Sequence, residues 1–141
     1  MASVDRVAAF DTTLEKTYQW LNDLAEDLGT GNRRQAYEVL RAFLHALRDR
    51  LPVASAVKLG AQLPMLVRGF YYEGWDPAHK PEKTHLGAFL EHVRREANLD
   101  PDQVEVAVRA ASRTLQRHVN EGELAKSLGI LPNDIFRLLV S

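Results

Sequence analysis

Five histidines are the residues best suited to bind a metal ion, and their spacing decides whether they can. His85 and His92 lie seven positions apart, roughly 10 Å along a helix, which is too far for both to bind one ion. Only His45 and His92 have an acidic residue four positions on, Asp49 and Glu96, which is the usual helical spacing of two ligands. Neither pair has a third ligand, and the chain has no cysteine. The sequence therefore predicts no metal site.

Motifs for nucleotide binding or catalysis are absent from the sequence. The chain contains no glycine-rich phosphate loop, no nucleophile elbow and no constellation typical of acid–base catalysis. Without cysteine it has no thiolate nucleophile and can form no disulfide bond. We therefore predict no catalytic residues and no cofactor, and we expect that the protein is not an enzyme.

The segment 123–139, ELAKSLGILPNDIFRLL, has the residue pattern of a helix-turn-helix. Small, glycine and apolar residues occupy the positions that such a unit keeps: Ala125, Gly129, Ile130, Ile135 and Leu138. If the segment bound DNA, Asn133 and Asp134 would lie at the start of the recognition helix and Arg137 on its exposed side. However, residues 104–141 carry five basic against four acidic residues, whereas a phosphate-binding surface is clearly basic. We favour a packed helix pair, with DNA binding as an alternative.

Three arginines at seven-residue spacing, Arg34, Arg41 and Arg48, are expected on one face of a helix. Residues 32–72 carry seven basic against two acidic residues, so this face could bind an anion or dock a partner. The alternative, which we favour, is a solvated helix flank in which Arg34 pairs with the acid four positions on. Arg41 has an equivalent in the second half of the chain, Arg109. These two could converge and clamp an acidic partner.

The sequence YYEGW places three large aromatic residues, Tyr71, Tyr72 and Trp75, close together. Such rings are frequent anchors of binding surfaces because they combine a large apolar area with a polar atom. They can equally lock two parts of a fold together, and this is the interpretation that we favour. In either case they should lie beside the junction between the two halves of the chain.

The second half of the chain repeats the pattern of the first at an offset of 68 positions. Identical residues recur at that offset: Gln35 and Gln103, Arg41 and Arg109, Ala42 and Ala110, Leu47 and Leu115, and Leu63-Pro64 and Leu131-Pro132. The apolar positions between them also coincide. We predict an all-α fold of eight helices, arranged as two pseudo-symmetric four-helix units, residues 10–72 and 85–140. A linker, residues 73–84, joins them, and both units pack as one compact bundle.

Helical spacing of apolar residues and capping signals place the first two helices. The first should span Phe10 to Leu28, with Asp11 or Thr12 as its cap and residues 29–31, which contain two glycines, at its end. The second should begin at Asn32, stop at Pro52 and be the longest.

The same signals place the remaining six helices. Two short helices are expected over residues 54–61 and 64–73. In the second half, helices should begin after Thr84, at Asp100-Pro101, at Asn120 and at Pro132.

Length and composition are those of one globular domain, and we expect residues 1–141 to form a single domain. Of the 141 residues, 45% are hydrophobic and 26% charged, which argues against disorder. The formal net charge of -1 provides no overall attraction to nucleic acid. No apolar run approaches the roughly 20 residues of a membrane span, and the start of the chain has no signal-peptide core. We therefore expect a cytoplasmic protein.

Three stretches carry a resemblance to a known family: FDTTLEKTYQWLNDLAEDLG, AYEVLRAFLHALRDRLPVASA and LGAQLPMLVRGFYYEGWDP. Over residues 5–140 the chain resembles the bacterial helical family called domain of unknown function 2267. The resemblance implies an all-helical cytoplasmic protein with no assigned activity, and it supplies no catalytic residues. The second half departs from the family pattern, since LAKSLGILP replaces an acidic run that ends in AQLP.

The sequence as a whole favours a non-enzymatic protein-interaction module. We expect the groove between the halves, flanked by Arg41, Arg109, Tyr71, Tyr72 and Trp75, to receive a protein partner or a second copy of the chain. The predicted core comprises Leu21, Leu24, Leu40, Phe43, Leu47, Phe89, Val93, Leu115 and Phe136. One alternative is a DNA-binding regulator that uses residues 123–139. Another is a small-ligand sensor or enzyme with a pocket between the halves.

Overall fold

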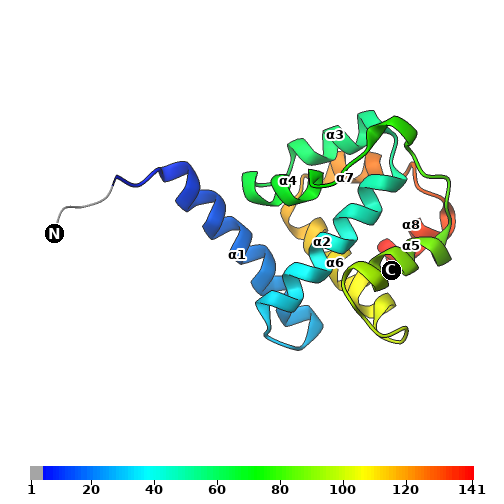
Figure 1. Cartoon of the computed structure of the whole chain (residues 1–141), viewed down its shortest axis with the longest axis horizontal. Helices are drawn as coiled ribbons and strands as arrows, with labels where there is room; N and C mark the ends of the chain where they lie inside the picture. The colour runs from blue at the N-terminus through cyan, green and yellow to red at the C-terminus, as the bar shows by residue number, and fades with distance from the viewer. Residues whose placement is uncertain (1–4) are drawn as a thin grey trace.

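The computed structural model describes residues 5–141, which form eight α-helices and one 3-10 helix with no β-strand (Figure 1). The helices are α1 (Ala8–Leu28), α2 (Arg33–Arg50), α3 (Val53–Ala61), α4 (Met65–Tyr72), η1 (Pro77–His79), α5 (Leu86–Glu96), α6 (Val104–His118), α7 (Glu121–Leu128) and α8 (Asn133–Leu139). The predicted all-α fold and its eight helices are confirmed. Residues 1–4, at the start of the segment in which no signal-peptide core is expected, lie outside the described part.

Helix α1 differs from the prediction at its start and agrees with it at its end. The helix begins at Ala8 behind Val7, which makes no side-chain capping bond, and the expected cap Asp11 binds Arg6 instead. At the other end Gly29 adopts φ 74° and its N–H bonds to carbonyls of the last turn, as expected of a glycine cap. With 21 residues α1 is longer than α2 with 18, so the prediction that the second helix is the longest is wrong.

Asparagine caps start two helices where the sequence predicts them. The Asn32 side chain accepts hydrogen bonds from the N–H groups of Arg34 and Gln35, and that of Asn120 accepts one from Glu123. In contrast, α6 does not begin at Asp100. A turn occupies residues 101–103, because the side chain of Gln103 accepts a hydrogen bond from the N–H of Asp100, and the helix begins only at Val104.

The core lies around α2, which packs against α1, α4, α5 and α6. The sequence of α2 explains this position. Apolar residues cover more than one side of the helix, and ten of its residues are buried. Of the predicted core, Leu21, Leu24, Leu40, Phe43, Leu47, Phe89, Val93 and Leu115 are buried, and Phe136 packs against the core half-buried.

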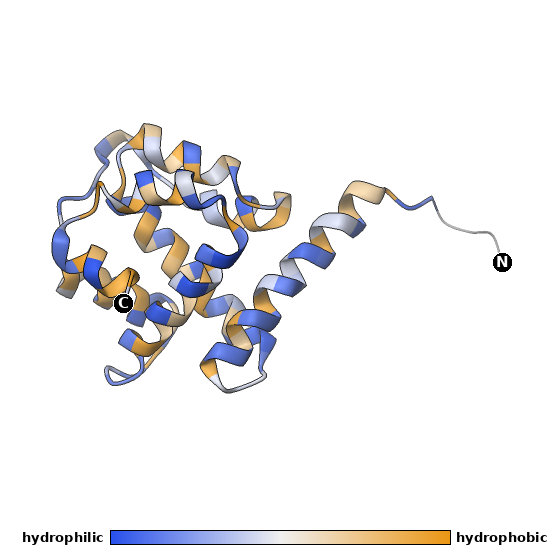
Figure 2. Ribbon diagram, turned by 180° about the vertical axis from the view of Figure 1, so that it is seen from behind, coloured by the Kyte–Doolittle hydropathy of each residue, from blue (hydrophilic) through white to orange (hydrophobic). Residues whose placement is uncertain are grey.

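The first turns of α1 extend away from the other helices and are dark blue in Figure 1. We call residues 8–14 the arm. Hydrophobic and hydrophilic residues alternate along this helix as they do along the others (Figure 2). Yet Val7, Phe10 and Leu14 remain 51%, 63% and 46% exposed. The arm therefore leaves apolar side chains uncovered by the rest of the described chain.

Within residues 5–141, none of the helices combines the length and the apolar composition needed to cross a membrane.

Candidate functional site

Two of the three aromatic residues of YYEGW, Tyr71 and Tyr72, lie against α3, within the first half of the chain. Tyr71 is fully buried, and its hydroxyl donates a 2.7 Å hydrogen bond to the carbonyl of Ala56, while burial raises the pKa of the phenol. The Tyr72 hydroxyl donates a 3.4 Å bond to the carbonyl of Val57, and its ring lies 5.4 Å from that of Trp75. The rings thus hold α4 on α3. Tyr71 offers no surface to a partner in this conformation.

Gly60 shows how tightly Tyr72 packs against α3. A Cβ atom at this position would overlap the phenol ring of Tyr72. The absence of a side chain at Gly60 is therefore what allows α3 and the Tyr72 ring to approach each other.

Arg41 is engaged within the chain. Its guanidinium donates hydrogen bonds to Glu73 and, at 3.1 Å, to Glu96 on α5. The bond with Glu73 raises the pKa of Arg41 above its ordinary value, although partial burial opposes this. The expected solvated flank is thus partly wrong, since of Arg34, Arg41 and Arg48 only Arg34 is exposed, and Arg48 is buried.

Glu96 is the centre of a polar cluster that joins three helices. Its carboxylate accepts hydrogen bonds from His45 (2.8 Å) and His92 (3.1 Å) as well as from Arg41. Burial raises the pKa of this carboxyl, but the bonds and charges of the two histidines outweigh it and lower the pKa to about 2. On the other side of its ring, Nε2 of His45 lies 2.6 Å from the carbonyl of Phe70 on α4.

Both ring nitrogens of His45 therefore face oxygen acceptors. The Glu96 carboxylate is already shared among Arg41, His45 and His92, so the arrangement joins helices and does not present an open ligand set. Among the described residues no group of three histidine or acidic side chains is placed to hold a metal ion.

Arg109 occupies a different environment from Arg41. Its Nε donates a 3.1 Å hydrogen bond to the hydroxyl of Ser141, which in turn donates one to the carbonyl of Leu138. Arg109 thus lies at the end of α8, whereas Arg41 lies against α5. The two arginines bind different partners and form no common clamp.

Of the three candidate DNA-binding residues, two are exposed and one is hydrogen-bonded within the protein. Asn133 and Arg137 are exposed. Asp134 is not free, because its carboxylate accepts hydrogen bonds from the N–H groups of Leu86 (3.0 Å) and Ile135 (2.8 Å). The bond from Leu86 lowers the pKa of Asp134 below its ordinary value. Asp134 thereby caps the start of α5.

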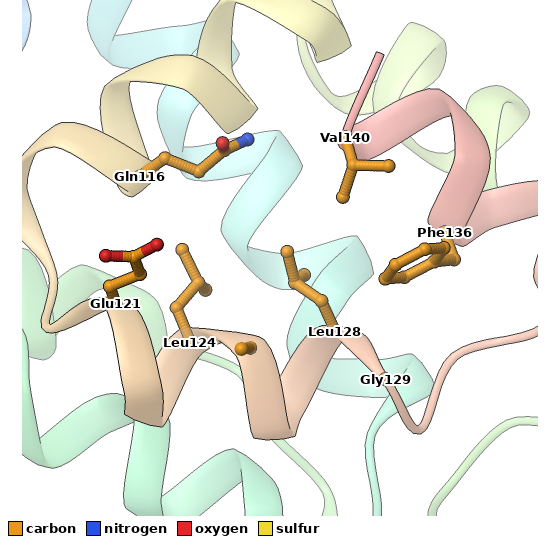
Figure 3. Close-up of a pocket in the computed structure, with 8 residues that line it drawn as sticks. Gln116, Glu121, Leu124, Leu128, Gly129, Phe136 and Val140 are labelled. Atoms are coloured by element: carbon orange, nitrogen blue, oxygen red, sulfur yellow. The ribbon is translucent and has the colours of Figure 1, made fainter.

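A cavity of about 470 Å³ opens between α6, α7 and α8. Figure 3 shows Leu124, Leu128, Phe136 and Val140 pointing into it, with Gln116 and Glu121 at its edge. A smaller cavity, about 220 Å³, lies between the two halves of the chain. The equivalent residues Gln35 and Gln103, and likewise Val39 and Ala107, line it from opposite sides.

The surface that sequence reasoning missed is a set of exposed apolar residues beside the arm. We call it the apolar face, and it consists of Val7, Phe10, Leu14, Tyr18, Tyr37 and Leu66, each between 38% and 63% exposed. Four of these residues line a groove of about 540 Å³ between α1, α2 and α4, with Phe70 at its floor. The Tyr37 and Phe70 rings meet edge to face at 5.2 Å.

One signal in the sequence could have revealed the apolar face. The stripe that begins at Phe10 predicts a longer helix than the stripe at 86–97, and α1 and α5 indeed have 21 and 11 residues. Phe10 and Leu14, the first apolar residues of this longer helix, are the ones that remain exposed.

The described residues thus form an all-helical bundle in which Arg41 and His45 of α2 and His92 of α5 bind within the chain. Residues 17–138 match the family described as Uncharacterized conserved protein (DUF2267), and the chain belongs to this family. The resemblance to this family, which includes the YYEGW region, is thereby confirmed. No curated protein matches the chain.

Proposed function

We propose that the protein is a non-enzymatic interaction module that binds protein partners through the apolar face. The observation that carries this proposal is the exposure of six large apolar side chains on one side of α1, α2 and α4. The largest apolar patch on a monomeric protein is often functional. This site replaces the groove flanked by Tyr71, Tyr72, Trp75, Arg41 and Arg109, because Tyr71 is buried and Arg41 is engaged.

The shape of the apolar face supports a protein partner over a small ligand. Leu14, Thr17, Tyr18 and Leu21 line its groove along α1. Phe10, one turn before Leu14, is the most exposed of the six residues. A projecting amphipathic helix beside an apolar groove is the geometry in which one protein packs a helix against another.

We also propose that the two halves arose by doubling of a four-helix unit, which would make the bundle pseudo-symmetric. The helix bounds support this at the offset of 68: α1 and α5 end at 28 and 96, α2 and α6 end at 50 and 118, α3 and α7 begin at 53 and 121, and α4 and α8 begin at 65 and 133. The packing has the matching form, since α2 contacts α5 and α6 contacts α1. Only α1 is extended, so doubling leaves the apolar face on one half.

Two alternatives receive less support. Against DNA binding, Asp134 is engaged as a cap for α5. Residues 123–139 also carry only two basic against two acidic residues, whereas a phosphate-binding surface is clearly basic. For a ligand sensor or enzyme, the cavity between the halves is about 220 Å³, below the roughly 300–1,000 Å³ of most ligand pockets.

Replacing Leu66 with aspartate should abolish partner binding without unfolding the protein. Leu66 is 42% exposed, so the change should lower the free energy of unfolding by no more than about 1–2 kcal/mol. A charge in the groove should nevertheless weaken an apolar contact strongly. The measurement is recovery of cross-linked partners, including further copies of the chain, with tagged wild-type and variant protein.

The matched control is Ile130→Asp, because Ile130 is 49% exposed on the connection between α7 and α8. It should recover the same partners as the wild type. Equal recovery by the Leu66 variant, or loss with the Ile130 variant alone, would move the binding surface away from the apolar face.

A further inference from the structure

We propose that the apolar face binds the same face of a second copy of this chain, with the two α1 helices lying antiparallel. This inference rests on the proposed function, for which it names the partner. Each copy would insert its arm into the groove of the other, so one two-fold axis relates two identical contacts.

Helix α1 carries both parts of such a contact. Phe10 stands on the arm, 63% exposed, and Leu14, one turn later, forms the near end of the groove. Phe10 and the near end of the groove thus lie one turn apart on the same helix. A two-fold axis that crosses α1 near residue 12 therefore sets Phe10 of each copy against Leu14 of the other.

The spacing along α1 agrees with helix pairing. Val7, Phe10, Leu14, Thr17 and Leu21 are separated by three and four positions in turn, which is the heptad spacing of paired helices. The later part of this seam is buried, with Thr17 at 4% and Leu21 at 7% exposure. The seam thus continues from the core onto the arm, where a second helix would cover it.

The apolar area fits a homodimer. Six side chains of roughly 150–200 Å², about half exposed, present on the order of 500 Å² per copy. A stable interface buries about 800 Å² per partner, and homodimer interfaces are roughly 65% apolar. The apolar face together with a polar rim therefore supplies the area and the composition that a second copy requires.

The charges around the face are mixed. Residues 5–16 carry three acidic and two basic side chains, so the arm does not select a strongly acidic or strongly basic partner. Among the described residues that line the groove, the charged one is Glu73, which is already bonded to Arg41. Arg6, just before α1, is likewise bonded to Asp11.

The arm also gains stability from a second copy. The hydroxyl of Thr13 accepts a hydrogen bond from the N–H of Leu66, which ties α1 to α4 at that point. The first turns of α1 extend beyond the other helices (Figure 1). Short helical segments without tertiary packing are marginal in water, so packing against a second arm favours the helical state of these turns.

The test is the oligomeric state by sedimentation equilibrium of the purified full chain. We expect a dimer for the wild type and for Ile130→Asp, and at least a ~30-fold higher dissociation constant for Phe10→Asp, since buried aromatic anchors dominate such contacts. A wild-type chain that is monomeric at all concentrations, or a dimer that Phe10→Asp leaves intact, overturns the inference.

A photo-reactive phenylalanine analogue at Phe10 separates failure of this inference from failure of the proposed function. Adducts with residues 14–37 or 66–70 of a second copy support the antiparallel dimer. If the purified chain gives no such adducts but the same variant cross-links another protein at the face in cells, the second copy is the wrong partner and the proposed function stands. If neither cross-link forms, both proposals fail.

Discussion

Replacing Arg48 with methionine is expected to lower the free energy of unfolding by about 3–4 kcal/mol. The Arg48 side chain is only 5% exposed, and it donates hydrogen bonds to the carbonyls of Tyr71 (2.8 Å) and Glu73 (2.9 Å) and to the carboxylate of Asp49 (2.9 Å). Methionine fills a similar volume but donates no hydrogen bond. The carbonyls at the end of α4 and the carboxylate would then be left without this donor.

Urea unfolding followed by circular dichroism measures this change. The control is Arg34→Met, since Arg34 is exposed on the same helix and should cost less than about 0.5 kcal/mol. Equal effects of the two substitutions would mean that Arg48 does not hold the end of α4. Total stability of most domains is about 5–15 kcal/mol, so the expected loss is a large fraction.

Glu96→Gln is expected to cost about 2–3 kcal/mol at neutral pH, somewhat less than breaking a fully buried pair because the side chain is 23% exposed. The carboxylate joins Arg41 and His45 of α2 to His92 of its own helix α5. An amide keeps the shape but turns one acceptor into a donor, so at least one of these three side chains loses its acceptor. Unfolding in urea again measures the loss, with Glu38→Gln, an exposed acid of α2, as the control.

The cost of Glu96→Gln should depend on pH. The pKa of Glu96 in the folded protein is about 2, below its ordinary value of 4.5. A lowered pKa means that the carboxylate contributes its stability fully above about pH 5, and that this contribution is lost as the pH falls toward 2. The difference in stability between wild type and variant should therefore shrink over that range. A difference that stays constant from pH 7 to pH 3 would contradict the assigned role of the carboxylate.

Helix positions could be predicted from the sequence because their signals are local. Asn32, Asn120 and Gly29 form caps where their residue types indicate them. The start of α6 is wrong by a few residues for an equally local reason, since Gln103 closes a turn with Asp100 that competes with the helix.

The partners of the charged residues and the exposure of Phe10 could not be predicted, because both depend on contacts between distant segments. Arg41 and Arg48 share a helix face in the sequence pattern, but Arg41 meets Glu96, 55 positions away, and Arg48 meets Tyr71. The spacing of residues along one helix does not show which residues of another helix lie opposite them. For the same reason Phe10 was expected in an apolar stripe, whereas only the structure shows that nothing in the described chain covers it.

Amide hydrogen exchange of the arm, residues 8–14, at low and high protein concentration tests most directly whether the apolar face is where the protein associates. Exchange in unsupported helical turns follows local fraying. At high concentration we predict at least ~10-fold slower exchange in residues 8–14 and slower exchange in 66–70, with α8 unchanged. Equal exchange of the arm at both concentrations, or protection that appears only in α8, would contradict the account.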